Sequence, residues 1–273
     1  MDVQSTLMAL TTNRMMAMNQ LQLAQSLEKL SSGYRINRAG DDAAGLAISQ
    51  KMRADTTIFE MASRNAQDGI SLIQTAEGAL TETHSMLNRM AELATQASNG
   101  IYDDEQRKAL DNEFQALKSE INRISDGTNF NGKNLLDGSL SDGLKLQIGN
   151  TADQSNIVSV NVDNMGTGGI GLSNLGISSL DSAQASLGAI KDAINTVSTQ
   201  RASLGALQNR QEHTINNLGV SIENLTAAES RIRDTDIAKE IMNYTKNSLL
   251  MQSSQAMAAQ AGLMSQSVLK LLR

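Results

Sequence analysis

The chain has 273 residues, with 23 lysines and arginines against 29 aspartates and glutamates, and a formal net charge of −6. That charge has the wrong sign for coating a phosphate backbone, so nucleic acid is not expected as a partner. The absence of cysteine excludes disulfides, cysteine-ligated zinc and thiol nucleophiles. The chain has no proline, 14 methionines and only 2% aromatic residues. This composition favours long helices that bury leucine, isoleucine, methionine and alanine in narrow seams.

The N-terminal segment is poor in charge, because residues 15–27 contain no ionisable side chain. No compact apolar run precedes a small-residue cleavage site, so a cleaved secretory signal peptide is not expected. The next feature is the pair Asp41 and Asp42, which could be a carboxylate pair for a metal or for acid–base chemistry. No third ligand or companion base is nearby, and both acids are therefore expected to cap a helix that begins near Ala43.

Two helices are predicted next, over residues 43–99 and 104–127. The first has an apolar seam in which Glu77 and His84 occupy two intermediate positions. The loop between the helices is short, which favours antiparallel packing. The apolar seam residues are Ile70, Ile73, Leu80 and Leu87 in the first helix and Leu110, Phe114, Leu117, Ile121 and Ile124 in the second.

The segment 128–180 is rich in glycine, asparagine, serine and aspartate, and it predicts turns and a small β-hairpin region. Its residues alternate between apolar and polar at Leu144–Ile148 and Ile157–Val162, as half-buried strands do. The glycines of Gly166–Gly171 match the spacing of a dinucleotide-binding loop. No long helix follows them directly, so this match is not expected to bind a nucleotide.

A third long helix is predicted over residues 182–230, where seam positions recur every 3.5 residues on average, the coiled-coil period. Polar residues occupy the middle of this seam, at Arg201, Gln208 and Gln211. They form either a register-setting layer or a contact surface, and the first interpretation is favoured. The other seam positions are Leu187, Ile190, Ile194, Val197, Leu204, Ile215, Leu218, Ile222 and Leu225.

The C-terminal segment has a seam at heptad-like spacing formed by Leu250, Met257, Ala261, Met264, Val268 and Leu271. Its longest uncharged stretch, 247–269, is too polar for a membrane span. Neither end of the chain has the charged outer face of a helix that meets water. The two ends are therefore expected to be disordered in the monomer and to become helical when copies of the chain assemble.

No catalytic machinery is predicted, and no metal or other cofactor is expected. The two histidines, His84 and His213, are isolated on predicted helices, and a packed or hydrogen-bonded role is favoured for each. The sequence has neither a His-Glu-x-x-His motif nor a nucleophile elbow nor a phosphate-binding loop. The fold class predicted from these patterns is mainly α: a long antiparallel helical hairpin or coiled-coil rod with a small β-hairpin region in the middle of the chain.

Several segments resemble bacterial flagellin, the subunit of the flagellar filament. The longest is Leu27–Leu46, which reads LEKLSSGYRINRAGDDAAGL. Shorter matches are RNAQDGI at Arg64–Ile70, QTAEGAL at Gln74–Leu80, ENLTAAESRIRD at Glu223–Asp234 and VLKLLR at Val268–Arg273. Residues 54–58 differ from the pattern that is common in the family.

The resemblance implies an inner coiled-coil core domain from residues 1–40 and 235–273, and an outer rod domain from residues 41–234. The variable outer domains of many flagellins are not expected. The implied function is a structural subunit that self-assembles into the extracellular filament used for swimming. Export through the flagellar type III channel without cleavage is implied, and so are an export chaperone, the filament cap and the hook-junction proteins as partners. The alternatives are a hook–filament junction protein of the same superfamily and a non-flagellar helical binding rod.

The resemblance also implies site residues. Vertebrate Toll-like receptor 5 is expected to recognise Arg89, Leu93 and Glu113, the first two on one helical face because they are four residues apart. The alternative is that these residues only pack one rod against the next. Contacts in the filament core are expected from Leu250, Met257, Met264, Val268 and Leu271.

Overall fold

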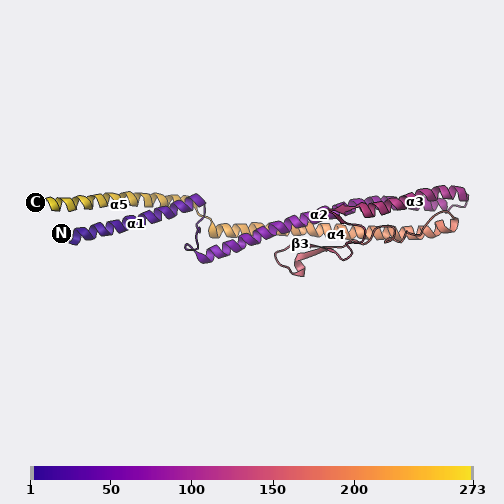
Figure 1. The fold of residues 1–273 in the computed structure, drawn as a ribbon, viewed down its shortest axis with the longest axis horizontal. Coiled ribbons are helices and arrows are strands. Elements are labelled where there is room, and N and C mark those ends of the chain that lie inside the picture. The colour runs from indigo at the N-terminus through magenta and orange to yellow at the C-terminus, as the bar shows by residue number, and fades with distance from the viewer. Residues whose placement is uncertain (1–2, 272–273) are drawn as a thin grey trace. The chain divides into compact units, whose positions relative to one another are not determined.

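The computed structural model describes the backbone of residues 3–271 and the side chains of Leu7 and of residues 10–263. The chain is mainly helical with two small antiparallel sheets, which confirms the predicted fold class. It divides into two compact units: residues up to Thr56 together with those from Glu223 form unit 1, and Thr57–Ile222 form unit 2. The elements are α1 (Val3–Ser32), α2 (Ala43–Ala97), α3 (Asp104–Gly127), β1 (Asn129–Phe130), β2 (Lys133–Asn134), β3 (Leu144–Gln147), η1 (Gln154–Asn156), β4 (Ile157–Val160), α4 (Leu180–Arg233) and α5 (Ile237–Leu271) (Figure 1).

Helices α2 and α3 begin where acidic side chains bind their free amides. Asp42 Oδ1 accepts a hydrogen bond of 2.9 Å from the backbone N–H of Gly45 and so caps α2. Asp103 and Gln106 form a reciprocal capping box at the start of α3. Asp41 differs from the prediction, because its carboxylate accepts the N–H groups of Asn37 and Arg38 in the preceding turn instead of capping α2. These backbone hydrogen bonds hold the pKa of Asp41 below its usual value.

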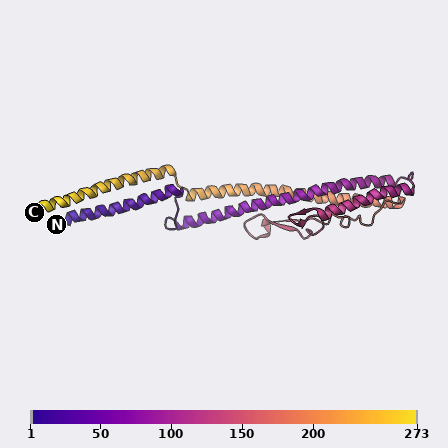
Figure 2. The same ribbon diagram turned by 45° about the horizontal axis from the view of Figure 1, so that its top comes forward.

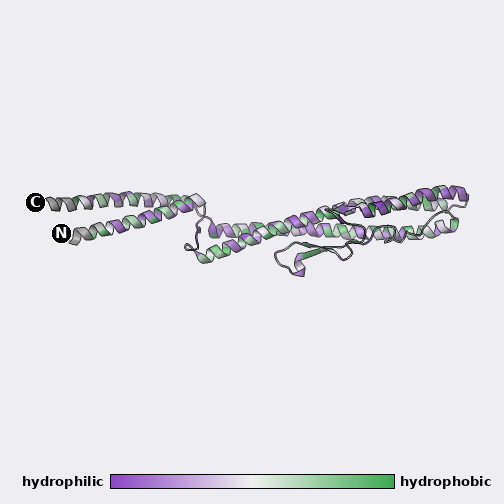
Figure 3. Cartoon of the chain, viewed as in Figure 1, coloured by the Kyte–Doolittle hydropathy of each residue, from purple (hydrophilic) through white to green (hydrophobic). Residues whose placement is uncertain are grey.

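The core of unit 2 is a seam shared by α2, α3 and α4. In Figure 3 apolar and polar residues alternate along each of these helices, so each helix buries only a stripe of its surface. Buried apolar side chains of the seam include Ile73, Leu80 and Leu87 of α2, Phe114 and Ile121 of α3, and Ile190, Val197 and Leu204 of α4. Most of the predicted apolar seam positions of the three helices therefore meet in one core. Ile70, Leu218, Ile222 and Leu225 lie outside it, and Ile215 packs against a smaller cluster with Ile148 and Val158.

The middle of the chain forms two β-hairpins. Strands β3 and β4 pair in antiparallel register, with Leu144 opposite Val160 and Gln147 opposite Ile157, and this confirms the predicted hairpin region. Strands β1 and β2 were not predicted. They are joined by the two-residue turn Asn131-Gly132, in which both residues have positive φ, at 49° and 78°. Asn-Gly is the preferred sequence for such a turn.

A row of polar side chains on α3 binds the loop that contains Gly166–Gly171. Lys118 Nζ donates to the carbonyls of Ser173 and Leu175 at 2.8 and 2.9 Å. Asn122 Oδ1 accepts from both the N–H and the hydroxyl of Thr167. Burial lowers the pKa of Lys118, and the charge of Asp111 partly opposes that shift. The glycine-rich stretch is thus a packed loop that covers the seam.

The polar positions in the middle of the α4 seam differ in their contacts. Arg201 lies 3.8 Å from the carboxylate of Glu77 on α2. Gln208 donates to Glu212 one turn later. Gln211 is fully buried beside Gly69, and neither its amide nitrogen nor its amide oxygen has a hydrogen-bond partner among the described residues. The register-setting interpretation therefore rests most directly on Gln211, whose burial has an energetic cost.

We predict that Gln211→Met stabilises unit 2 by about 1 kcal/mol, because a buried unpaired amide costs roughly 1–3 kcal/mol and methionine has a similar volume. Gln208→Met is the matched control and should change the free energy of unfolding by less than about 0.5 kcal/mol. Urea unfolding of dilute protein, followed by circular dichroism, measures both. A lower unfolding midpoint for Gln211→Met than for wild type would contradict the prediction.

Candidate functional site

The first candidate surface is the helix pair α1 and α5 of unit 1, which lie side by side in both ribbon views (Figures 1 and 2). The pair is joined by a hydrogen bond of 2.9 Å from Asn19 Nδ2 to Ser254 Oγ. The only described side chains of the two helices that are buried are the polar ones of Ser26 and Glu240. Among the described side chains, the pair therefore has no buried apolar core of its own.

Large apolar side chains are exposed along both helices of the pair. The exposed fraction reaches 75% for Leu10 and 65% for Met242. Soluble monomers rarely expose contiguous apolar surface on this scale, and such surface marks a site of protein contact. Among the described side chains, those exposed are Leu7, Leu10, Met15, Met18, Leu21 and Leu27 on α1, and Ile237, Ile241, Met242, Leu249, Leu250, Met257 and Leu263 on α5.

A groove of about 400 Å³ lies between α1 and α5. Its apolar lining comes from Met15 and Met18 of α1 and from Leu250 and Met257 of α5. Two of the predicted core-contact residues, Leu250 and Met257, are thus brought together on one surface of the pair. The other three, Met264, Val268 and Leu271, lie outside the described side chains.

The two connections that lead to α1 and α5 are clamped to each other. Gly33, which ends α1 with a φ of 75°, accepts a backbone hydrogen bond from Thr235, and Arg35 donates one to the carbonyl of Arg233. The Arg233 guanidinium lies 4.3 Å from the centre of the Tyr34 ring, a cation–π contact. Sequence reasoning missed this clamp, although Gly33, Tyr34, Arg35 and Arg233 lie inside the segments that carry the family resemblance.

The second candidate surface surrounds Arg89 in unit 2. Arg89 Nε lies 2.8 Å from Glu113 on α3, and its Nη1 lies 2.9 Å from Glu92. Both hydrogen bonds raise the pKa of Arg89, so the side chain stays charged. Leu93 differs from the prediction: it is only 1% exposed and belongs to the unit 2 core. Leu93 is on the same side of α2 as Arg89, but it packs in the core shared with α3 and α4. Leu93 therefore offers no exposed apolar anchor.

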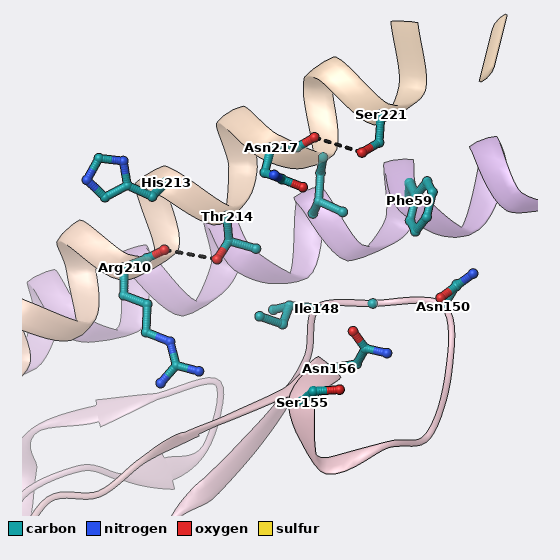
Figure 4. Close-up of a pocket in the computed structure, with 12 residues that line it drawn as sticks. Phe59, Ile148, Asn150, Ser155, Asn156, Arg210, His213, Thr214, Asn217 and Ser221 are labelled. Carbon is teal, nitrogen blue, oxygen red and sulfur yellow. Dashed lines mark hydrogen bonds between the residues drawn. The ribbon is translucent and has the colours of Figure 1, made fainter. Parts of the chain in front are cut away.

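The third candidate site is a cavity of about 510 Å³ between α4 and the β3–β4 hairpin (Figure 4). The hydroxyls of Thr214 and Ser221 donate to carbonyls of their own helix, those of Arg210 and Asn217. The imidazole of His213 points away from the hairpin in Figure 4. This arrangement does not pair a nucleophile with a base.

The described residues also give no support for a metal site or a catalytic site elsewhere in the chain. Within residues 3–271, no three His, Asp or Glu side chains gather as metal ligands would. His84 Nδ1 is buried without a hydrogen-bond partner among the described residues. Over the same part of the chain, no helix has the length and apolar character needed to span a membrane. The exposed apolar face of α1 and α5 is therefore the strongest candidate site, and its chemistry is that of protein–protein contact.

Two family descriptions and several curated proteins are similar to this chain. Residues 3–141 match the family description "Bacterial flagellin N-terminal helical region", and residues 187–272 match "Bacterial flagellin C-terminal helical region". Similar curated proteins are flagellins from Bacillus subtilis, 48% identical, and Halalkalibacterium halodurans, 50% identical, each match covering 100% of both chains.

Among solved structures, a Bacillus cereus flagellin is 31% identical with a TM-score of 0.51, over 57% of this chain and 88% of that one. A flagellar hook-associated protein from Vibrio parahaemolyticus has a TM-score of 0.58 over 71% of this chain and 100% of that one. It is only 14% identical, so it shows the same fold alone.

We predict that α1 and α5 exchange their amide protons rapidly in dilute protein and become protected when copies assemble. The pair lacks buried apolar side chains among those described, so its helices gain little from packing in a single copy. Hydrogen exchange read by mass spectrometry, with the Ile73–Leu87 seam as the internal reference, tests this. Protection of α1 and α5 in dilute protein equal to that of the seam would overturn it.

Proposed function

The chain belongs to the bacterial flagellin family, and we propose that its α1–α5 pair makes the subunit contacts by which it builds the flagellar filament. The protein is a structural subunit of that filament, and the filament serves swimming motility. The observation that supports the proposed contact surface is the set of exposed apolar side chains on a helix pair whose described side chains form no buried apolar core. Other copies of the chain are the partner that every filament subunit has.

The free energy of apolar burial favours assembly through the exposed apolar side chains of α1 and α5. Full burial of one leucine or methionine side chain is worth roughly 1.5–3 kcal/mol, and thirteen of the pair's described large apolar side chains are exposed in the single chain. Part of that gain offsets the cost of ordering the two ends. Because charge is scarce on both helices, copies can pack on several sides of the pair without burying unpaired ions.

The domain assignment also remains a proposal. Residues 1–40 and 235–273 form the inner domain that lines the filament core, and residues 41–234 form the outer rod. The clamp of Tyr34 and Arg233 lies near the proposed domain boundaries at residues 40 and 234. It holds the segment that follows α1 against the segment that precedes α5. The continuous seam of α2, α3 and α4 supports the rod, because it gives unit 2 a complete core without help from neighbouring copies.

The export route and the accessory partners that the family resemblance implies are also part of the proposal. We expect passage through the flagellar type III channel without cleavage, and contacts with an export chaperone, the filament cap and the hook-junction proteins. A chain without disulfides can pass a narrow channel unfolded. The exposed apolar side chains of α1 and α5 must be shielded before assembly, because such surface associates non-specifically. Shielding is the task of a chaperone.

We predict that Leu250→Asp abolishes filament formation and leaves unit 2 helical. Leu250 is 42% exposed in the single chain and lines the α1–α5 groove, so its replacement costs the monomer little. In the filament the same carboxylate would be desolvated without a partner, which costs several kcal/mol per subunit.

Gln252→Asp is the matched control, since Gln252 is exposed on the same helix and is already polar. Sedimentation and electron microscopy read filament formation, and circular dichroism reads helix content. Normal filaments from Leu250→Asp would show that this side chain does not face another subunit.

Recognition by vertebrate Toll-like receptor 5 is a further proposal. Arg89 and Glu113 are half-exposed and held against each other, so they present a fixed pair of charges to a partner. Leu93 supports the same segment from the core. If assembly covers this face, the monomer should signal and the intact filament should not.

We predict that Arg89→Ala with Glu113→Ala raises the monomer concentration needed for half-maximal receptor signalling by at least about tenfold, or about 1.4 kcal/mol. Leu93 is left unchanged in this test, since its truncation would open a core cavity. The control is Glu120→Ala with Arg123→Ala, another exposed ion pair on the rod. A reporter-cell assay decides: equal signalling by both pairs of variants would refute the receptor site, and so would silence of the wild-type monomer.

A further inference from the structure

We propose that Asn99 is a self-modification site: its side-chain amide is lost spontaneously in the folded chain through attack by the backbone nitrogen of Gly100. The chain contains a second Asn-Gly sequence, Asn131-Gly132. The two sites differ in local structure, and the geometry assigns the reaction to Asn99 and protects Asn131. This inference concerns unit 2 alone and does not depend on filament assembly.

The reaction needs only water. The Gly100 nitrogen loses its proton to water and bonds to Cγ of Asn99, and the bond from Cγ to Nδ2 breaks. Ammonia leaves and a five-membered succinimide remains. A water molecule then opens the ring at either carbonyl, which gives aspartate or isoaspartate at position 99. No oxidant, reductant or enzyme takes part.

The attacking group is unobstructed. Asn99, Gly100 and Ile101 are exposed in the short loop between α2 and α3. Gly100 has no side chain, and no atom outside its immediate neighbours lies within 4 Å of the place where a Cβ would stand. Its N–H donates no hydrogen bond to any described residue. The nitrogen can therefore reach the neighbouring side chain without breaking an existing contact.

Two hydrogen bonds activate the reacting groups. The N–H of Ile101 donates to Oδ1 of Asn99 at 3.2 Å, where negative charge develops when Cγ is attacked. Arg107 Nη2 donates to the backbone carbonyl of Asn99 at 3.2 Å. That carbonyl belongs to the same peptide group as the Gly100 nitrogen, so the cation stabilises the deprotonated, attacking form.

Arg107 is well placed for this role because it is fixed. Its side chain is only 6% exposed, and its Nε donates to the carbonyl of Ala97 at 3.0 Å. Asp104 also binds it, at 3.2 Å. A held guanidinium acts without having to be ordered during the reaction.

The same sequence at Asn131-Gly132 is locked by strand pairing. Both residues adopt positive φ in the two-residue turn, and Phe130 pairs with Lys133 across it. The hairpin is extended by a hydrogen bond from Leu135 to Thr128. To fold the Asn131 side chain onto the next nitrogen, the backbone must leave the turn geometry and give up this pairing, which slows the reaction.

The product at position 99 is well tolerated. It makes the net charge one unit more negative than −6. The new carboxylate forms beside the loop's own cation, the Arg107 guanidinium, which already binds the backbone carbonyl of residue 99. Modification therefore marks the age of a molecule without unfolding it.

The test follows both sites in one molecule. Full-length protein is incubated at neutral pH, digested with trypsin and examined by tandem mass spectrometry for conversion in peptides 90–107 and 124–133. In the folded protein, Asn99 should convert at least about tenfold faster than Asn131, equivalent to about 1.4 kcal/mol of barrier. In urea-denatured protein the two rates should be equal, since both are then flexible Asn-Gly sequences.

Gly100→Ala is the matched variant, because the added methyl has open space and leaves the fold intact. It should slow conversion at Asn99 severalfold and leave Asn131 unchanged, because the methyl obstructs the attacking nitrogen. Equal rates at the two sites in folded protein, or a wild-type rate at Asn99 in Gly100→Ala, would overturn the proposal.

Discussion

The buried seam between α2 and α4 is the interaction on which the rest of unit 2 depends. Without proline, both helices run for more than fifty residues, far beyond the length at which an isolated helix supports itself. Ile73 and Leu80 on one side and Val197 and Leu204 on the other exclude water along the pair. Helix α3 and the glycine-rich loop can pack only because this seam already provides a continuous apolar stripe.

Unit 1 shows what happens when the same residue types lack such a seam. Helices α1 and α5 also lie side by side, yet their described apolar side chains are exposed or half-buried. Two narrow helices can cover only one side of each other, and their remaining faces carry too little charge to be stable in water. Unit 2 therefore has an apolar core of its own, whereas the exposed apolar side chains of α1 and α5 fit the proposed contacts with further copies.

Much of this could be predicted from the sequence, because helix periodicity depends on local spacing. The seams of α2, α3 and α4 and the β3–β4 hairpin follow from apolar residues at regular intervals. The capping role of Asp42 was also predictable, but the role of Asp41 was not, since it depends on how residues 37 and 38 turn back. The burial of Leu93 likewise depends on neighbouring helices, which four-residue spacing does not describe.

The missed contacts are those made between distant parts of the chain. Lys118 and Asn122 bind a loop about fifty residues away, and Tyr34 meets Arg233 across nearly the whole sequence. Nothing in the local pattern marks these side chains as partners. The β1–β2 turn is different, because Asn131-Gly132 is a recognised turn signal that was available in the sequence.

The polar positions of the α4 seam explain how α2 and α4, which both have a regular apolar repeat, keep one register relative to each other. A seam with a uniform apolar repeat could slide by one heptad and still bury a similar area. In the observed register Arg201 lies near Glu77, and Gln211 fits beside Gly69, where the missing side chain leaves room. A shift by seven residues would separate the two charges and place the Gln211 amide against larger side chains. The unpaired amide thus costs stability in the observed register but costs more in the alternatives, and this difference fixes the alignment of α2 and α4 in unit 2.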